Sequence, residues 1–238
     1  MIARLALPAV VLALVVAGCG DNKKKESATT TAAPAATQTA ASTTATTAPV
    51  AKDAAGCDKV EAPQPKGEQK LPKPTLKLSA DKPATIVLDT NCGPVTIKLD
   101  VKRAPKTASS VASLAKMGFY DGLTFHRILA DFVLQGGDPL GNGQGGPGYS
   151  IVEKPPADLQ YTRGIVAMAK TSVEAPGTSG SQFFIVTGQN VGLPAEYALV
   201  GKVTGSYAAV DKIAAEPVSG PEGSPLSPVV IKKATLKQ

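Results

Sequence analysis

The chain has 238 residues and a formal net charge of +6, with its lysine and arginine residues scattered among acidic ones. Aromatic residues make up only 4% of the sequence and are not interleaved with basic clusters. Nucleic acid surfaces combine clustered cations with stacking aromatics, so the composition argues against a nucleic acid partner. The length is sufficient for one sizeable core with appended segments.

The start of the chain, residues 1–18, has the pattern of a signal peptide. Arg4 precedes an apolar run over residues 5–17, which is too short to span a bilayer and ends in small residues. The sequence "VAGC" resembles the bacterial lipobox, so Cys19 is the predicted lipidation site and membrane anchor. An ordinary secretory signal with an incidental cysteine is the alternative. Lipidation is favoured because the apolar run stops at "AGC" and polar "GDNKKK" follows.

Residues 19–56 are predicted to form a disordered, lipid-anchored tether. Residues 27–50 consist almost entirely of Thr, Ala, Ser and Pro, with no apolar period that could bury a core. Residues 57–82 contain repeated prolines and are predicted to be extended and irregular. The folded domain is expected to cover residues 83–238.

Two cysteines, Cys57 and Cys92, remain once Cys19 is assigned to lipid. A cysteine pair in an exported chain favours a disulfide over free thiols, which are the alternative. A zinc site is disfavoured because the chain has no Cys-x-x-Cys pair and only one histidine. We therefore expect no metal site and no cofactor.

From residue 83 onward, short apolar runs alternate with connections rich in glycine or proline. Eight runs are candidate strands: "ATIVL", "VTIKL", "TFHRIL", "FVLQ", "GIVAMA", "SQFFIVT", "ALVGKV" and "PVVIKKATL". Helical spacing occurs twice, over residues 105–117, which begin with proline and stop at Gly118, and over residues 206–215. This pattern predicts a mainly β fold, a closed barrel capped by two helices, because closure removes exposed strand edges.

The stretch "TFHRILADFVLQGGDP" places the only histidine, His126, beside Arg127 in an otherwise apolar strand. Strict alternation predicts that His126 shares a face with Ile128. Arg127 then lies on the other face, with Phe125 and Leu129. A lone histidine on a strand is more often structural than catalytic, which disfavours hydrolase chemistry. An arginine inside a strand is buried only with a partner, and the alternative is a surface arginine.

Amide side chains occur among phenylalanines in two of these runs. Gln135 ends "FVLQ" and Gln182 precedes "FFIV". This mixture predicts a groove with an apolar floor and a few polar groups, which suits a peptide ligand. The sequence "GNGQGG" matches GxGxxG, but Pro147 and Gly148 follow where a helix would have to begin. We interpret it as a flexible surface loop.

Taken together, "FHRILADFVLQGGDPLGNGQGGPGY", "GIVAMAK" and "GTSGSQFFIVT" resemble the cyclophilin family of peptidyl-prolyl isomerases, from about residue 83 to residue 237. The resemblance implies an eight-stranded antiparallel barrel capped by two helices. It also implies a catalytic group consisting of Arg127, Phe132, Gln135 and Phe184, in which Gln135 orients the arginine. The substrate-binding positions that it implies are His126, Val133, Ala169, Lys170, Gln182, Leu193 and Tyr197.

This sequence departs from the family pattern around the rim of the implied site. Val133 replaces a common methionine, Lys170 an asparagine, and Tyr197 the histidine of eukaryotic members. Gly192 stands where those members have a tryptophan that helps to bind cyclosporin. About three extra residues lie within "TSVEAPGTSG".

Three hypotheses follow for the function. The first is a monomeric, lipid-anchored isomerase that acts on X–Pro segments of unfolded or exported proteins. The second is a non-catalytic module or holdase chaperone that grips proline-containing peptides, motivated by the altered rim. The third is a purely structural envelope protein, which would have neither activity nor peptide affinity.

Overall fold

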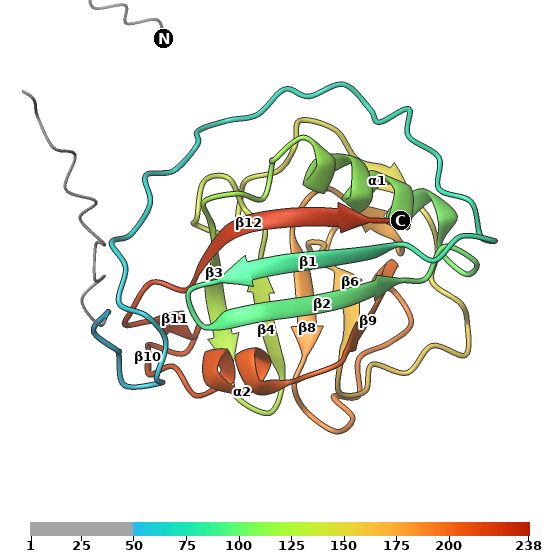
Figure 1. Cartoon of the computed structure of the whole chain (residues 1–238). Helices are drawn as coiled ribbons and strands as arrows, with labels where there is room; N and C mark the ends of the chain where they lie inside the picture. Colours follow the sequence, from blue (N-terminus) through green and yellow to red (C-terminus); the bar gives the residue numbers. More distant parts are fainter. Residues whose placement is uncertain (1–49) are drawn as a thin grey trace, which may run out of the picture. The chain divides into compact units, whose positions relative to one another are not determined.

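The computed structural model describes residues 50–238 (Figure 1). The predicted signal peptide, the lipidation site Cys19 and the tether up to residue 49 lie outside the described residues. Within the described part of the chain, no helix has the length and apolar character needed to cross a membrane.

Eight strands close into a barrel in the order β1-β12-β3-β4-β8-β6-β9-β2, and all neighbouring pairs are antiparallel. Each barrel strand falls on one of the eight predicted runs, so the predicted mainly β barrel is confirmed. The strands are β1 (Thr85–Thr90), β2 (Gly93–Leu99), β3 (Leu123–Leu129), β4 (Val133–Gly136), β6 (Ile165–Met168), β8 (Phe183–Val186), β9 (Leu199–Thr204) and β12 (Val230–Lys237).

The two predicted helices are present as α1 (Pro105–Lys116) and α2 (Ala208–Ala214), and Figure 1 shows them at the upper and lower ends of the barrel. Pro105 begins α1. The first residues of a helix have no partner for their N–H groups within the helix, so the N–H that proline lacks is not needed there. Gly118 follows the helix with a φ of 70°, a conformation that favours glycine and ends the helix.

Four two-residue strands were not predicted, because two residues cannot establish a period. They form two small sheets beside the barrel, β5 with β7 and β10 with β11. Their bounds are β5 (Ile151–Val152), β7 (Thr178–Ser179), β10 (Val218–Ser219) and β11 (Ser224–Pro225).

A β-bulge in β3 decides how its side chains are distributed. Phe125 and Arg127 pair with consecutive residues of β4, so His126 between them is an extra residue without a partner there. As a result Phe125 and Ile128 are both buried in the barrel core, whereas His126 and Arg127 are only half-buried. The predicted alternation, with His126 beside Ile128 and Arg127 beside Phe125, is wrong because the inserted residue shifts the two-residue period by one.

Barrel strands β4, β6, β8 and β9 are covered by apolar side chains on both faces. In β8, Phe183 and Ile185 belong to the main core inside the barrel, whereas Phe184 and Val186 belong to a second apolar cluster on the outer face. Burial on both faces explains why the run "FFIV" has no polar residue. The same outer cluster contains Val133 of β4, Ala167 of β6 and Leu199 of β9.

Residues 57–82, called the strap below, contain no helix and no named strand, and they pack against the barrel (Figure 1). Leu71, Leu76 and Leu78 contact the main core. The Leu71 N–H donates to the carbonyl of Pro147 at 2.8 Å, and the Leu78 N–H donates to Ser109 Oγ at 3.0 Å.

Hydrogen bonds also connect residues that directly precede or follow the start of the strap. The Asp53 carboxylate accepts the N–H groups of Ala55 and Cys57, at 3.0 and 2.8 Å. The Lys59 N–H donates to the carbonyl of Ala51 at 2.8 Å. These local hydrogen bonds do not depend on an apolar period, so the composition of the segment does not reveal them.

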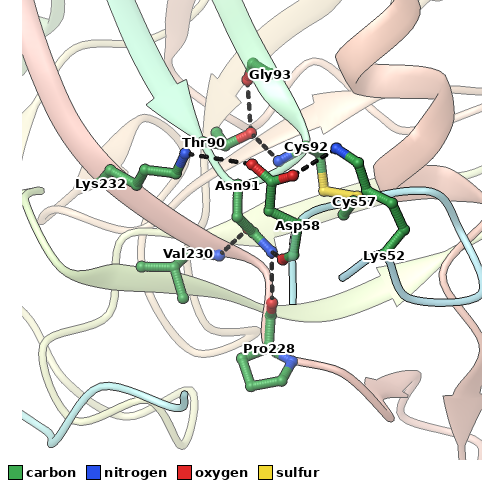
Figure 2. A network of polar contacts seen from close by, with 10 residues as sticks. All are labelled: Lys52, Cys57, Asp58, Thr90, Asn91, Cys92, Gly93, Pro228, Val230 and Lys232. Carbon is green, nitrogen blue, oxygen red and sulfur yellow. Dashed lines mark hydrogen bonds and ion pairs between the residues drawn. A yellow bond between two sulfur atoms is a disulfide. The ribbon is translucent and has the colours of Figure 1, made fainter. Parts of the chain in front are cut away.

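Cys57 and Cys92, the predicted pair, form a disulfide that joins the start of the strap to the turn between β1 and β2 (Figure 2). Next to it, the Asn91 side chain donates to the carbonyls of Asp58 and Pro228, at 2.8 and 3.1 Å, and accepts the N–H of Val230 at 2.8 Å. Asn91 therefore connects the strap to β12 independently of the sulfur atoms.

The Asp58 carboxylate forms ion pairs with Lys52 and Lys232 in the same network (Figure 2). The hydrogen bond from Lys52, more than any other contact, holds the pKa of Asp58 below its usual range. Both ion pairs lie at the surface, so they position the strap more than they stabilise the fold.

Reduction of the disulfide is expected to lower the free energy of unfolding by about 3–4 kcal/mol. The two cysteines are 35 residues apart, and the bridge restricts the unfolded chain over that loop. Denaturant midpoints of oxidised and reduced protein measure the change, with Cys57→Ala/Cys92→Ala as the control that cannot form the bridge. An unchanged midpoint would show that the network around Asn91 holds the strap unaided.

Candidate active site

A row of cross-strand partners brings together three of the four predicted catalytic residues, Arg127, Gln135 and Phe184. Arg127 on β3 is paired with Gln135 on β4. Gln135 is paired with Phe184 on β8, which is paired in turn with Ala167 on β6. Directly paired residues have their Cβ atoms roughly 5 Å apart. Antiparallel register therefore places an arginine, an amide and an aromatic ring side by side, although the sequence separates them widely.

An apolar patch lies beside this row. It consists of four members of the outer cluster, namely the buried Val133 and Phe184 and the half-buried Phe132 and Leu193. The ring of Tyr197 meets Phe184 edge-on, with 5.4 Å between ring centroids. The predicted apolar floor thus corresponds to side chains from β4, β8 and the segment between β8 and β9.

The guanidinium of Arg127 makes no hydrogen bond and no ion pair with any residue in the range 50–238. Arg127 is half-buried and keeps all five N–H donors available. The resemblance had implied that Gln135 orients it. In the structure, Gln135 Nε2 donates to Gln182 Oε1 at 3.0 Å. Gln182, which directly precedes β8, thus supplies the acceptor for Gln135 Nε2, and the orienting role of Gln135 stays a prediction.

The glycine-rich loop, residues 140–148, is held in place from two sides. The buried carboxylate of Asp138 accepts the N–H groups of Leu140 and Asn142, at 2.8 and 2.9 Å. On the other side, Gln182 Nε2 donates to the carbonyls of Gly143 and Gly145, both at 2.9 Å. This loop was predicted to be a flexible surface loop, but two polar side chains that surround it fix its backbone.

A cavity of about 760 Å³, called the side pocket below, adjoins the row at Gln135. Ala169 and Gln182, both predicted to contact substrate, line it together with the glycine-rich loop. Predicted site residues are therefore divided between two surfaces. One is the apolar patch around Phe184, and the other is the polar side pocket, with Gln135 between them.

Lys170 lines the side pocket, but its charge is directed into the surrounding loop. Its side chain is only 4% exposed, and its ammonium lies 3.3 Å from the carboxylate of Glu196. The ammonium also donates to the carbonyls of Thr171 and Glu174, and lies 5.5 Å from the ring centroid of Tyr197. We interpret Lys170 as a residue that fixes the backbone around Thr171 and Glu174 and connects it to Glu196.

His126 projects from the bulge next to Arg127. Neither ring nitrogen has a hydrogen-bond partner among the described residues. Burial lowers the pKa of His126 and nearby Arg127 lowers it further, although the Asp138 carboxylate acts in the opposite direction. The folded protein therefore favours the neutral imidazole.

Tyr161 supports the apolar patch and was missed in the sequence. Its hydroxyl donates to the carbonyl of Tyr197 at 2.7 Å and accepts the N–H of the same residue at 3.0 Å. Its ring lies 6.2 Å from that of Phe184. Burial raises the pKa of Tyr161 to about 12. Tyr161 lies outside every predicted strand, so no periodicity could have identified it.

Within residues 50–238 no group of three or more histidine, cysteine or acidic side chains is arranged to hold a metal ion.

A family model and several known proteins that resemble this chain all point to the same family. The family model described as cyclophilin type peptidyl-prolyl cis-trans isomerase/CLD matches residues 85–236. Peptidyl-prolyl cis-trans isomerase B of Streptomyces anulatus is 37% identical over 168 residues, which cover 63% of this chain and 94% of that protein. The probable peptidyl-prolyl cis-trans isomerase A of Mycobacterium leprae is 36% identical over 171 residues, covering 64% and 92%.

A solved structure agrees with these relatives. A cyclophilin-type isomerase from Cryptosporidium parvum, determined in the presence of the dipeptide Ala-Pro, is 30% identical and has a TM-score of 0.60. The match covers 65% of this chain and 99% of that one.

Acidification below about pH 6.5 is expected to destabilise the fold, because the folded protein favours the neutral form of the half-buried His126. The unfolded chain takes up a proton near the usual pKa of 6.5, whereas the folded chain does so only at lower pH. The stability due to the neutral ring is thus complete above 6.5 and is lost as pH falls through the lower folded pKa.

Denaturant unfolding at several pH values measures this effect. His126 is the only histidine, so no other imidazole contributes. The variant His126→Asn should lose the pH dependence in this interval. Identical pH profiles for the variant and the wild type would contradict the assignment.

Proposed function

This chain belongs to the family of cyclophilin-type peptidyl-prolyl cis-trans isomerases, and from that premise we propose that Arg127 supplies its catalytic hydrogen bond. The observation that carries the proposal is the register of β3, β4 and β8, which places Arg127 in one row with Gln135 and Phe184. The Cryptosporidium relative was studied with Ala-Pro, which supports a proline-containing peptide as the ligand here.

The reaction rotates an X–Pro amide over a barrier of about 20 kcal/mol without breaking a bond. It needs no nucleophile, metal ion or proton relay. In the planar amide the proline nitrogen shares its lone pair with the carbonyl and is a poor acceptor. At the twisted transition state the lone pair is localised on nitrogen and accepts a hydrogen bond well. A donor placed there binds the transition state more tightly than the ground state, which is the condition for catalysis.

Arg127 suits this role for two reasons. A guanidinium does not deprotonate in proteins, and it carries its donors in a fixed planar arrangement. No ion pair or hydrogen bond with another described residue occupies those donors, so they are available to the substrate. The Nε2 of Gln135 is bound to Gln182, whereas its side-chain oxygen accepts no hydrogen bond from residues 50–238 and can accept a peptide N–H.

One hydrogen bond does not account for the whole acceleration. Raising a rate of about 0.01 per second to hundreds per second requires roughly 6 kcal/mol. A charge-assisted hydrogen bond contributes about 1.5–3 kcal/mol. We assign the remainder to the apolar patch of Phe132, Val133, Phe184 and Leu193. It would hold the proline ring in dry surroundings that favour the less polar twisted amide.

Replacement of Arg127 by alanine is expected to reduce kcat/KM by about 10- to 150-fold, which corresponds to the loss of one charge-assisted hydrogen bond. The kcat/KM of Arg127→Lys should lie between those of the wild type and Arg127→Ala, since lysine retains the charge but not the planar set of donors. The measurement is the cis-to-trans rate of an X–Pro peptide with the full chain. Arg103→Ala, which removes an exposed arginine elsewhere, is the matched control.

Other results of this assay distinguish the alternatives. If wild type and Arg127→Ala both equal the uncatalysed rate, the enzyme proposal fails. If the wild type and Arg127→Ala nevertheless both bind the peptide, a binding module or holdase would be favoured. Absence of both activity and affinity would favour a structural envelope protein.

We further propose that the clients are exported proteins and that the chain is anchored outside the cytoplasm by a lipid on Cys19. Two observations support this. The apolar run ends at "VAGC", and the Cys57–Cys92 disulfide is typical of an oxidising compartment. A lipid anchor would keep the isomerase where exported chains fold.

Lipidation is tested by metabolic labelling with an alkyne fatty acid in a bacterial host, followed by membrane fractionation. Wild type should take up the label and sediment with membranes, whereas Cys19→Ser should be unlabelled. The variant Cys57→Ser controls for labelling of other cysteines and should retain the label. An unlabelled wild type would contradict the anchor.

A further inference from the structure

The strap contributes to the side pocket. Glu68 and Gln69 line the same cavity as Gln135, Ala169 and Gln182. Gln135 belongs to the row that contains Arg127, and Gln182 is hydrogen-bonded to Gln135. A segment that precedes the barrel in sequence therefore lies within reach of a peptide bound at the row.

Two backbone hydrogen bonds fix the strap on either side of these residues. The Lys66 N–H donates to the carbonyl of Pro139, and the Leu71 N–H donates to the carbonyl of Pro147, both at 2.8 Å. The Lys66 ammonium also donates to the carbonyl of Phe119 at 2.8 Å. The glycine-rich loop between Pro139 and Pro147 is thus bound to the strap at both of its ends.

Gly148 allows this close approach. A side chain at this position would collide with the backbone of the strap at Gln69 and Lys70. Its φ of 88° also favours glycine. Glycine at position 148 therefore lets the glycine-rich loop lie directly against the backbone of the strap.

Two carboxylates that line the side pocket, those of Glu68 and Glu174, form no ion pair with residues 50–238, but only that of Glu68 is also free of hydrogen bonds. The ammonium of Lys170 is bound to Glu196, and the Glu174 carboxylate accepts the N–H and the hydroxyl of Thr171, at 2.7 and 3.0 Å. Glu68 is exposed and makes no hydrogen bond or ion pair with residues 50–238. Gln69 uses its Nε2 on the carbonyls of Lys66 and Gly67, which leaves its side-chain oxygen as an acceptor.

We propose that the strap and the glycine-rich loop form a substrate subsite that binds a lysine or arginine side chain flanking the X–Pro bond, with Glu68 as its charged partner. The proposal rests on the isomerase function. The pocket offers acceptors and an unpaired negative charge, which a cationic side chain with a long apolar stem complements. Its volume of about 760 Å³ leaves room for such a side chain.

The test uses the full chain and X–Pro peptides that carry lysine, leucine or glutamate at each of the two positions on either side of the X–Pro pair. At one of these positions, wild type should turn over the lysine peptide with a kcat/KM about two- to fivefold above that of the glutamate peptide, the range of an exposed ion pair. Glu68→Lys should abolish or reverse this preference when the lysine and glutamate peptides are each compared with the leucine peptide in the same variant. Glu61→Lys, on the same strap but outside the pocket, should retain it.

Each outcome has a distinct meaning. Equal turnover of all three peptides by wild type would overturn the subsite and leave the isomerase function intact. A preference for glutamate would show that Lys170 governs the pocket, and would also overturn it. If Glu61→Lys loses the preference as fully as Glu68→Lys, the effect is one of net charge and the local subsite is wrong. No turnover of any peptide would be a failure of the isomerase function itself.

Discussion

The register of β3 against β4 governs the geometry of the site. Because His126 is an extra residue in β3, Phe125 and Ile128 can both fill the barrel core while Arg127 faces outward opposite Gln135. A regular strand would have placed Phe125 and Arg127 on the same face, so that either an aromatic ring left the core or a charge entered it. The bulge resolves this conflict, and its consequence is that the His126 imidazole has no hydrogen-bond partner among residues 50–238.

The outer face of the barrel is a second place where packing determines function. Phe184 and Val133 are buried there by a cluster that Tyr161 and Tyr197 extend, and Tyr161 binds both backbone groups of Tyr197. The apolar patch is thus part of a packed layer, and its side chains are held in position before a peptide arrives. Fixing the patch in advance removes an entropic cost from binding and from the transition state.

The sequence was sufficient for the parts of this structure that repeat a local period. The eight barrel strands, both helices and the grouping of Arg127, Gln135 and Phe184 follow from runs of residues and from a family resemblance. It was insufficient wherever a single residue or a distant contact decided the result. The bulge at His126, the partner of Gln135 and the role of Tyr161 depend on tertiary neighbours that no local pattern contains.

The strap illustrates the same limit and also explains why the disulfide lies where it does. A proline-rich segment has little intrinsic structure, so ordering it against the barrel costs conformational entropy. The Cys57–Cys92 bridge fixes one end to the β1–β2 turn and the chain itself fixes the other at β1, so that part of this cost is already met by the covalent structure. The remaining contacts, at Pro139, Pro147 and Gly148, then suffice to hold Glu68 and Gln69 at the side pocket. A segment that composition describes as a spacer is thereby positioned to act as a wall of the substrate site.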